Sequence, residues 1–351
     1  MPEDLWSEQD TTPGAIEAAL RQLLYERHST DAAYVPARVL NLVVVVDRDW
    51  RGEVANRLER VGRYHGSRTI LCTVEAGRER LDARVSMAYD ENPEPGTLAV
   101  VRENVELQIG PQHAAALDTV VDPILVTGLI TMVWAPHGHQ EAVDSLLQSS
   151  DVVLLDSVED PDVGEALSRV VEVAERAYIV DLAWLRSTPW RERVCASFDP
   201  PQWRPDLWRI SGVTVRHHPE SLAAAALFCG WLASRLGWKA QALTSVRDHQ
   251  EGRLRARRGE VAVRLEPQPR QSVPGLAGIT IETADGGSLS LDRGPGGLSA
   301  RRVDRKGHEW RWTVLGASRG ESGILGEGVR QALLRDPTYR PALDAARAMV
   351  A

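Results

Sequence analysis

The apolar run at residues 39–46, VLNLVVVV, constrains the fold of this chain more than any other segment. It is β-branched and apolar almost throughout, so both faces of the strand that it predicts must be covered. Residues 53–64 then have the spacing of an amphipathic helix, and residues 68–74 are strand-like again. Strand, helix and strand in this order predict a βαβ unit with a right-handed crossover.

Strands and helices continue to alternate as far as residue 182. Further strands are predicted at residues 84–87, 98–109, 129–134, 152–156 and 177–182, and helices at residues 15–28, 112–121, 139–148 and 162–176. A turn signal at residues 92–96, NPEPG, separates the first two of these strands. This alternation is typical of an α/β domain with a mostly parallel sheet.

The pattern changes after residue 182. A segment rich in Trp and Pro leads to a strand at residues 207–216 and an apolar helix at residues 220–236; short strands follow, and two of them flank the hairpin signal Asp285-Gly286-Gly287. Two helices at residues 324–334 and 340–350 end the chain. We therefore expect a flexible N-terminus (1–14), an α/β domain (15–182), a connecting segment (183–238) and a smaller, antiparallel α+β domain with closing helices (239–351).

Charge and composition exclude several classes of protein. The 351 residues carry 41 Lys and Arg against 49 Asp and Glu, a net charge of −8, which disfavours a dedicated nucleic-acid binder. The most apolar stretch, residues 124–135, is too short to cross a bilayer. No secretory signal is visible, and the three cysteines (Cys72, Cys195 and Cys229) lie far apart, as in a reducing compartment. We expect a cytoplasmic protein that binds neither nucleic acid nor membranes; its oligomeric state is left open.

The motifs that would bind cofactors or metals are missing from the sequence. No GxGxxG follows a strand and no GxxxxGK[ST] occurs; the turn after residues 39–46 reads DRDWRGE, in which two Asp and a Trp would repel a pyrophosphate. His137, His139 and Glu141 form the best metal-like cluster, but a polar turn that opens a helix explains them better. We predict no catalytic residue, no cofactor and no metal.

Two segments concentrate charge. Residues 141–181 hold eleven acidic side chains against Arg169 and Arg176, and residues 247–258 (RDHQEGRLRARR) are basic. The acidic segment could hold a cation, dock a basic partner or form a solvated helix surface, and the last is the favoured interpretation. The basic segment lacks interleaved aromatic residues, so one solvated face of a sheet is favoured over nucleic-acid binding.

The segment at residues 181–201, DLAWLRSTPWRERVCASFDPP, is the most informative. Ser187, Thr188 and Pro189 predict a helix start, after which Trp190, Val194 and Phe198 fall on one face. Trp and Arg are enriched at interface hot spots. From the residues alone, however, the favoured interpretation is that Trp184 and Trp190 are core residues that pin this helix to the sheet. The candidate partner interface consists of Trp184, Arg186, Thr188, Pro189, Trp190 and Arg191.

The same segment resembles the signature of the OpcA family, the glucose-6-phosphate dehydrogenase assembly proteins. Five further segments agree with this signature in order, over roughly residues 39–238: the run at residues 39–46, HGSRTILCTVEA, residues 124–135, DVVLLDSVEDP and AAAALFCGWLASRLGW. The resemblance implies a non-catalytic protein that binds glucose-6-phosphate dehydrogenase and promotes its assembly or activity in the oxidative pentose phosphate pathway. No regulatory cysteine can be carried over; Cys72 and Cys229 are predicted to be inert, buried thiols.

Two alternatives remain at this stage. One is a sugar-phosphate or nucleotide-binding enzyme on the same α/β scaffold. The other is a transcriptional regulator that uses residues 247–258, which predicts DNA binding that weakens steeply with salt.

Overall fold

The computed structural model describes residues 3–30, 34–36, 38–62, 66–89, 99–294, 296–315 and 321–351. The turn predicted at residues 92–96 lies outside these ranges. The chain forms two compact units. Unit 1 comprises Met1–Leu155, Arg176–Val180 and Gly328–Leu333; unit 2 comprises Asp156–Glu175, Asp181–Glu327 and Leu334–Ala351.

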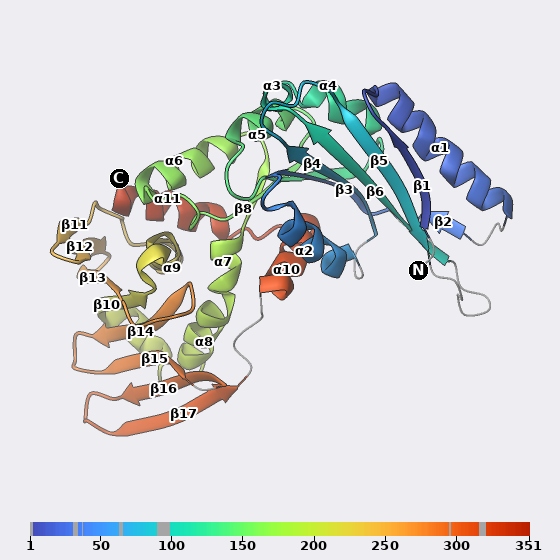
Figure 1. Cartoon of the computed structure of the whole chain (residues 1–351). Helices are drawn as coiled ribbons and strands as arrows, with labels where there is room; N and C mark the ends of the chain where they lie inside the picture. The colour runs from blue at the N-terminus through green and yellow to red at the C-terminus, as the bar shows by residue number, and fades with distance from the viewer. Residues whose placement is uncertain are drawn as a thin grey trace. The chain divides into compact units, whose positions relative to one another are not determined.

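The described part of unit 1 is built on one mixed, mostly parallel sheet. Its strands are β1 (Glu3–Glu8), β2 (Tyr34–Pro36), β3 (Leu40–Asp47), β4 (Ser67–Val74), β5 (Asp82–Tyr89), β6 (Ala99–Ile109), β7 (Ile130–Trp134), β8 (Val152–Leu155) and β9 (Tyr178–Asp181). They lie in the order β1-β5-β6-β4-β3-β7-β8-β9, with β2 beside β6 (Figure 1). The pairs β6–β4, β4–β3, β3–β7 and β7–β8 are parallel, and β1 and β5 add an antiparallel edge.

The apolar run at residues 39–46 becomes the central strand β3, which is buried from Leu40 to Val46. Val43 and Val45 belong to one core cluster with Ile16 of helix α1 (Pro13–Thr30). Alternate residues of a strand point to opposite faces, so Val44 points to the other face, where helix α2 (Arg51–Gly62) packs against β3 and β4. The remaining described helices of unit 1 are α3 (Pro111–Ala114), α4 (Asp118–Val121) and α5 (Gln140–Leu146).

Two local predictions in unit 1 differ from the structure. Residues 1–14 were expected to be loose, but Glu3–Glu8 forms β1, which pairs antiparallel with β5. This pairing joins residues about eighty positions apart and leaves no local signal in a polar segment. The helix predicted at 112–121 is broken into α3 and α4.

Unit 2 contains a second sheet whose described neighbours are antiparallel except for β10 and β13. Its strands are β10 (Ile210–His217), β11 (Thr244–Val246), β12 (His249–Ala256), β13 (Gly259–Pro267), β14 (Leu276–Thr283), β15 (Ser288–Gly294), β16 (Gly297–Val303) and β17 (Glu309–Leu315), in the order β11-β12-β13-β10-β14-β15-β16-β17. The α/β class, with a mostly parallel sheet followed by a mostly antiparallel one, is confirmed.

The described α-helices of unit 2 include one that is buried along most of its length. They are α6 (Val163–Val173), α7 (Leu182–Arg186), α8 (Thr188–Phe198), α9 (Leu222–Leu236) and α11 (Tyr339–Val350); α10 (Glu321–Leu334) has residues in both units. Helix α9 is buried from Ala223 to Ala233, because it packs on β10 and β13 as well as on α6, α7 and α11. A helix that is buried all round is apolar all round.

The domain boundaries of the structure differ from the expected ones. The segment predicted to connect two domains, residues 183–238, lies wholly within unit 2. Its strand β10 is central there, because it pairs with β13 and with β14, which follow it by some fifty to seventy residues. The local sequence pattern predicts the strand β10, but it does not show that β13 and β14 pair with it.

Gly230 sets the distance between α9 and α11, and we expect its replacement with alanine to destabilise unit 2. An added Cβ would lie 2.2 Å from the Ala342 carbonyl oxygen and 2.9 Å from the Ala346 amide nitrogen, both of which are backbone atoms that cannot move aside cheaply. We expect Gly230→Ala to lower the free energy of unfolding by about 2 kcal/mol, measured by urea denaturation.

Gly326→Ala in α10 is the matched control, since nothing lies within 4 Å of the added Cβ there. In a helix, alanine is favoured over glycine by up to about 1 kcal/mol, so this variant should be as stable as the parent or slightly more so. Equal stability of the Gly230→Ala variant would contradict the close contact between the two helices.

Candidate functional site

The order of the parallel strands in unit 1 reverses at one point in the sheet. Apart from the short β2 beside β6, β3 comes first in the chain among the parallel strands, and it lies between β4, the second, and β7, the fourth. Open α/β sheets bind ligands at such a point, beyond the carboxyl ends of the strands. The residues there are Asp47, at the end of β3, and the turn that follows β7.

Side chains of the protein occupy the position beyond the carboxyl ends of β3 and β7. The ring of Trp50 stacks on that of His137, with centroids 4.3 Å apart, and Nε2 of His139 lies 3.2 Å from Oδ1 of Asp47. Both histidines have positive φ, 66° for His137 and 57° for His139. Such a conformation is uncommon for residues other than glycine, and here it directs two imidazoles at the β3–α2 turn.

The backbone of the β3–α2 turn is also engaged. The N–H groups of Arg48, Trp50 and Arg51 donate to the carbonyl oxygens of Val74, Asp47 and Arg48, at 3.1–3.3 Å. A dinucleotide fold uses free backbone N–H groups at this position to bind a pyrophosphate. This turn presents a carboxylate and an indole ring instead.

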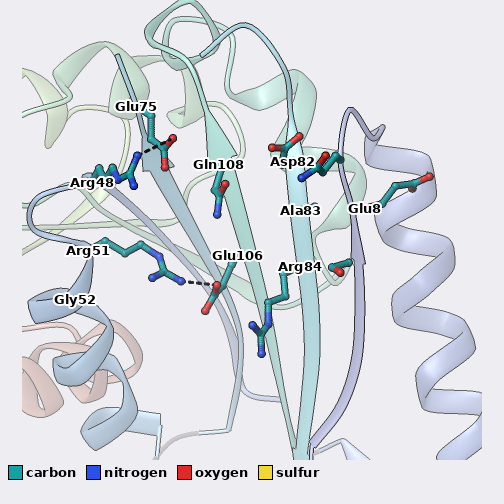
Figure 2. Close-up of a pocket in the computed structure, with 12 residues that line it drawn as sticks. Glu8, Arg48, Arg51, Gly52, Glu75, Asp82, Ala83, Arg84, Glu106 and Gln108 are labelled. Carbon is teal, nitrogen blue, oxygen red and sulfur yellow. Dashed lines mark hydrogen bonds and ion pairs between the residues drawn. The ribbon is translucent and has the colours of Figure 1, made fainter. Parts of the chain in front are cut away.

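A polar depression of about 690 Å³ lies beside this turn, on unit 1 (Figure 2). It is lined by charged side chains of both signs that extend from the β3–α2 turn and from the ends of β4, β5 and β6. Arg51 pairs with Glu106 at 2.6 Å, and Arg48 lies 3.7 Å from Glu75. Arg84 also lines the depression, but four carboxylates face the three arginines there, so the depression does not concentrate positive charge for a phosphate.

The tryptophans of the 184–191 segment lie in the interior of unit 2. Trp184 is 2 % exposed; its indole Nε1 donates to Oδ2 of Asp336 at 2.9 Å, and the Arg191 guanidinium stacks 3.4 Å above its ring. Arg191 is itself buried, which lowers its pKa to about 10, and it donates to the Trp184 carbonyl oxygen at 2.7 Å. Trp190 is buried with Val194 and Phe198 on the predicted face of α8.

The other three candidate residues are less buried. Arg186 pairs with Asp156 at 2.6 Å, Thr188 accepts a hydrogen bond from Arg191 at 3.0 Å, and Pro189 lies in the first turn of α8. The helix start predicted at Ser187 is confirmed, with Pro in its first turn, but the expected hydroxyl cap is not: the Ser187 hydroxyl donates to the Trp184 carbonyl oxygen at 2.8 Å. Packing accounts for every described contact of the six candidates, and their contact with a partner stays a prediction.

Asp181, just before these helices, is a buried carboxylate held by three donors. It accepts hydrogen bonds from the backbone N–H groups of Ser157 and Ala183 and, at 2.9 Å, from the Tyr339 hydroxyl. Burial, together with the neighbouring charge of Asp156, raises the pKa of Asp181 from its ordinary 3.8 to about 6. These contacts cap α7 and join it to α11.

Unit 2 carries a second hollow, of about 500 Å³, that we call the tryptophan groove. Three tryptophans, two arginines and several smaller side chains line it: Arg193, Ala196, Ser197, Pro200, Gln202, Trp203, Leu291, Arg302, Trp310, Trp312 and Val314. None of these described lining residues is acidic. Trp310 and Trp312 are 43 % and 37 % exposed, which is unusual for such large apolar side chains.

Contacts from α8 and β16 hold the groove in shape. The Arg302 guanidinium lies over the rings of Phe198 and Trp203, at 4.9 and 4.4 Å, and it donates to the Ser197 carbonyl oxygen at 2.6 Å. Trp203 and Trp310 meet edge to face, with centroids 5.5 Å apart. A preformed wall of aromatic rings is therefore available at the surface.

Sequence reasoning missed this groove, although part of its signal was present. The alternation at residues 308–314, HEWRWTV, places Trp310, Trp312 and Val314 on one face of a strand. It does not tell which face is covered, because that depends on α8, more than a hundred residues earlier in the chain.

The cysteines, the basic segment and the predicted absence of metal sites and membrane spans remain to be compared with the structure. Cys72 and Cys229 are buried, as predicted, and burial raises the pKa of both thiols to about 12; Cys195 is exposed. In the basic segment, Arg253 pairs with Glu260 at 3.1 Å. The described residues hold no group of three or more His, Cys, Asp or Glu side chains arranged to bind a metal ion. Across the same residues, no helix combines the length and the apolar character needed to span a bilayer.

Comparison with solved structures finds similarity to dehydrogenase-like chains. The oxidoreductase yvaA from Bacillus subtilis has a TM-score of 0.49 and 11 % identity, and covers 89 % of this chain and 95 % of its own. The apo scyllo-inositol dehydrogenase from Lactobacillus casei has a TM-score of 0.45 and 11 % identity, and covers 90 % and 96 %. At this level of similarity these structures carry no part of the functional argument.

Curated relatives share part of the sequence. The OxPP cycle protein OpcA of Synechococcus elongatus is 28 % identical over 201 residues, which are 56 % of this chain and 44 % of the relative. The OxPP cycle protein OpcA of Nostoc punctiforme is 32 % identical over 133 residues, 36 % of this chain and 29 % of the relative. The chain thus matches less than half the length of each of these relatives.

Family models match most of the chain. Residues 58–172 match the N-terminal domain of the glucose-6-phosphate dehydrogenase subunit, and residues 177–343 match the C-terminal domain of the same family. The two models follow each other in order, and both carry the OpcA name that the cyanobacterial relatives also bear. The resemblance inferred from the 181–201 segment is therefore confirmed, and this chain belongs to the OpcA family.

Proposed function

We propose that this chain is a non-catalytic partner of glucose-6-phosphate dehydrogenase, which it binds and activates at the entry to the oxidative pentose phosphate pathway. The match of residues 58–172 and 177–343 to the two dehydrogenase subunit domains carries this proposal. The names of the cyanobacterial relatives, which refer to the same pathway, support it.

The geometry of unit 1 supports a non-catalytic role. The ligand position of an open α/β sheet is filled by the Trp50–His137 stack and by the Asp47–His139 contact. In the β3–α2 turn, the backbone N–H groups of Arg48, Trp50 and Arg51 donate to carbonyl oxygens of the protein. A fold of this class supports many functions, so function is inferred from the residues at the site and not from the fold.

Activation follows from linkage. A partner that binds the active conformation or oligomer of the dehydrogenase better than the inactive one shifts the population toward the active form. Each tenfold difference in affinity shifts that equilibrium by about 1.4 kcal/mol. The partner needs no catalytic group of its own for this effect.

Adding this protein to the dehydrogenase of the same organism is expected to raise kcat/KM by about fivefold or more, in the range typical of allosteric coupling. The two proteins should also co-elute in size-exclusion chromatography. Steady-state kinetics over a titration of this protein measures the effect, with heat-denatured protein as the control. Absence of both co-elution and a kinetic effect would refute the proposal.

The alternative is a sugar-phosphate or nucleotide-binding enzyme, for which the polar depression beside Arg48 and Arg51 is the candidate site. The internal pairing of those arginines argues against it. Isothermal titration of this protein alone with glucose 6-phosphate and with NADP separates the two functions. Tight binding in the absence of the dehydrogenase would favour the enzyme.

A further inference from the structure

We infer that the tryptophan groove of unit 2 is the docking site for an apolar segment of glucose-6-phosphate dehydrogenase that carries carboxylate side chains. This inference rests on the proposed function for the identity of the partner. The groove itself is argued from its exposed aromatic surface, its charge and one buried donor that has no acceptor.

The exposed aromatic surface is the first observation. Trp310 and Trp312 are about two-fifths exposed, and together with Trp203, Leu291 and Val314 they form an apolar wall. Tryptophan is the residue type most enriched at interface hot spots, where it fills a desolvated pocket at the centre of the contact. A hollow of about 500 Å³ accepts a few side chains of a partner segment.

Charge is the second observation. Arg193 and Arg302 line the groove, and no described lining residue is acidic. The charge of Arg302 is partly balanced by the carboxylate of Asp206, which lies 3.6 Å away and is not one of the residues that line the groove. The charge of Arg193 is therefore the one that a partner is best placed to neutralise, and an arginine beside an aromatic wall selects a carboxylate.

The third observation is independent of the first two. Nε of Arg193 is buried and has no hydrogen-bond partner among the described residues. A buried donor without an acceptor costs free energy, and native proteins rarely keep one. An acceptor supplied by a bound carboxylate would satisfy the guanidinium and convert this cost into affinity for the correct partner.

Another hollow of unit 2 has a related composition, which makes it a useful comparison. It is lined by Trp208, Trp238, Arg257 and Arg258 and is about 230 Å³, less than half the size of the groove. Trp208 is 60 % exposed, but this hollow has no buried donor without an acceptor among its described side chains. The observations therefore favour the tryptophan groove.

The test measures the affinity of purified dehydrogenase for variants of the full chain by biolayer interferometry. Trp310→Ala and Trp312→Ala are each expected to weaken binding at least about tenfold, as hot-spot tryptophans do. Arg193→Met, which removes the charge and keeps most of the side-chain length, is expected to weaken binding about tenfold and to make it less sensitive to salt.

Two variants serve as controls. Thr313→Ala changes the neighbouring position of β17, whose side chain points to the opposite face, and Trp208→Ala removes an exposed tryptophan from the smaller hollow. Both are expected to bind as the parent does. Circular dichroism and thermal melting show whether each variant is folded. If a tryptophan variant is unfolded, the affinity of the Arg193→Met variant tests the groove in its place.

The outcomes separate the inference from the function on which it rests. Parental binding by Trp310→Ala, Trp312→Ala and Arg193→Met, or loss of binding at Trp208→Ala alone, overturns the groove and leaves the proposed function standing. Failure of the parent protein to bind the dehydrogenase overturns both. Loss of affinity at the three groove positions, with both controls unaffected, supports the inference.

Discussion

Replacing Trp184 with alanine is expected to lower the free energy of unfolding by about 4 kcal/mol, within the range for buried aromatic residues. The side chain is almost fully buried, and its removal leaves a large cavity. It also removes the indole N–H that donates to Asp336 and the ring on which Arg191 stacks, so the buried guanidinium loses a favourable contact.

Urea denaturation followed by tryptophan fluorescence measures this effect in unit 2, where eight of the eleven tryptophans lie. Trp208→Ala is the control, because its exposed ring should cost less than about 1 kcal/mol. Trp184→Phe keeps an aromatic ring and loses the N–H group, so it should fall between the two. A Trp184→Ala variant as stable as the parent would contradict the packing described for this residue.

This result bears on the 184–191 segment as a partner interface. Trp190→Ala and Arg191→Glu also alter buried side chains, so we expect both variants to lose stability as well as partner binding. If binding in each variant falls in proportion to the folded fraction, the segment acts through packing. Loss of binding by a fully folded variant would instead support direct contact with the dehydrogenase.

The order of elements in the fold could be predicted from local pattern because each element carries a local signal. The run at residues 39–46 is apolar on both faces, so it had to be a covered central strand, and β3 is one. Helix α9 ends at Gly237, in the left-handed conformation that such a glycine favours. Partners distant in sequence give no such signal, which is why β1 and the place of β10 were missed.

The candidate site was predictable only in part, for a related reason. Trp190, Val194 and Phe198 were correctly placed on one face of a helix, but tryptophan and arginine are enriched both in cores and at interfaces. Burial separates these two roles, and burial depends on which elements pack together. The same limit hid the exposure of Trp310 and Trp312, whose alternation was visible in the sequence.

The buried carboxyl of Asp181 should make the stability of unit 2 depend on pH in the opposite sense to an ordinary surface ion pair. Its pKa is raised from 3.8 to about 6 in the folded protein, first by burial and then by Asp156. The folded state therefore binds the proton more tightly than the unfolded state does. The stability contributed by this group is complete below about pH 4 and is lost as the pH rises through about 6.

Asp181→Asn isolates this effect. The amide oxygen can still accept from the N–H groups of Ser157 and Ala183, and the amide nitrogen can donate to the Tyr339 hydroxyl, so the contacts are largely kept. About two pKa units correspond to roughly 3 kcal/mol. The variant should therefore gain up to about 3 kcal/mol relative to the parent between about pH 4 and pH 7, measured by urea denaturation at each pH.

Two further variants test the cause of the pH dependence. Tyr339→Phe removes a donor to the Asp181 carboxylate, so the pKa of Asp181 should rise further and stability should be lost over a higher pH range. Asp248→Asn, which changes a carboxyl whose side chain is 86 % exposed, serves as the surface control. A difference in stability between Asp181→Asn and the parent that does not vary with pH would mean that water or a positive charge compensates the buried carboxylate. Asp181 caps α7 and accepts a hydrogen bond from Tyr339 of α11. If partner binding requires folded unit 2, binding should therefore weaken as the pH rises above about 6.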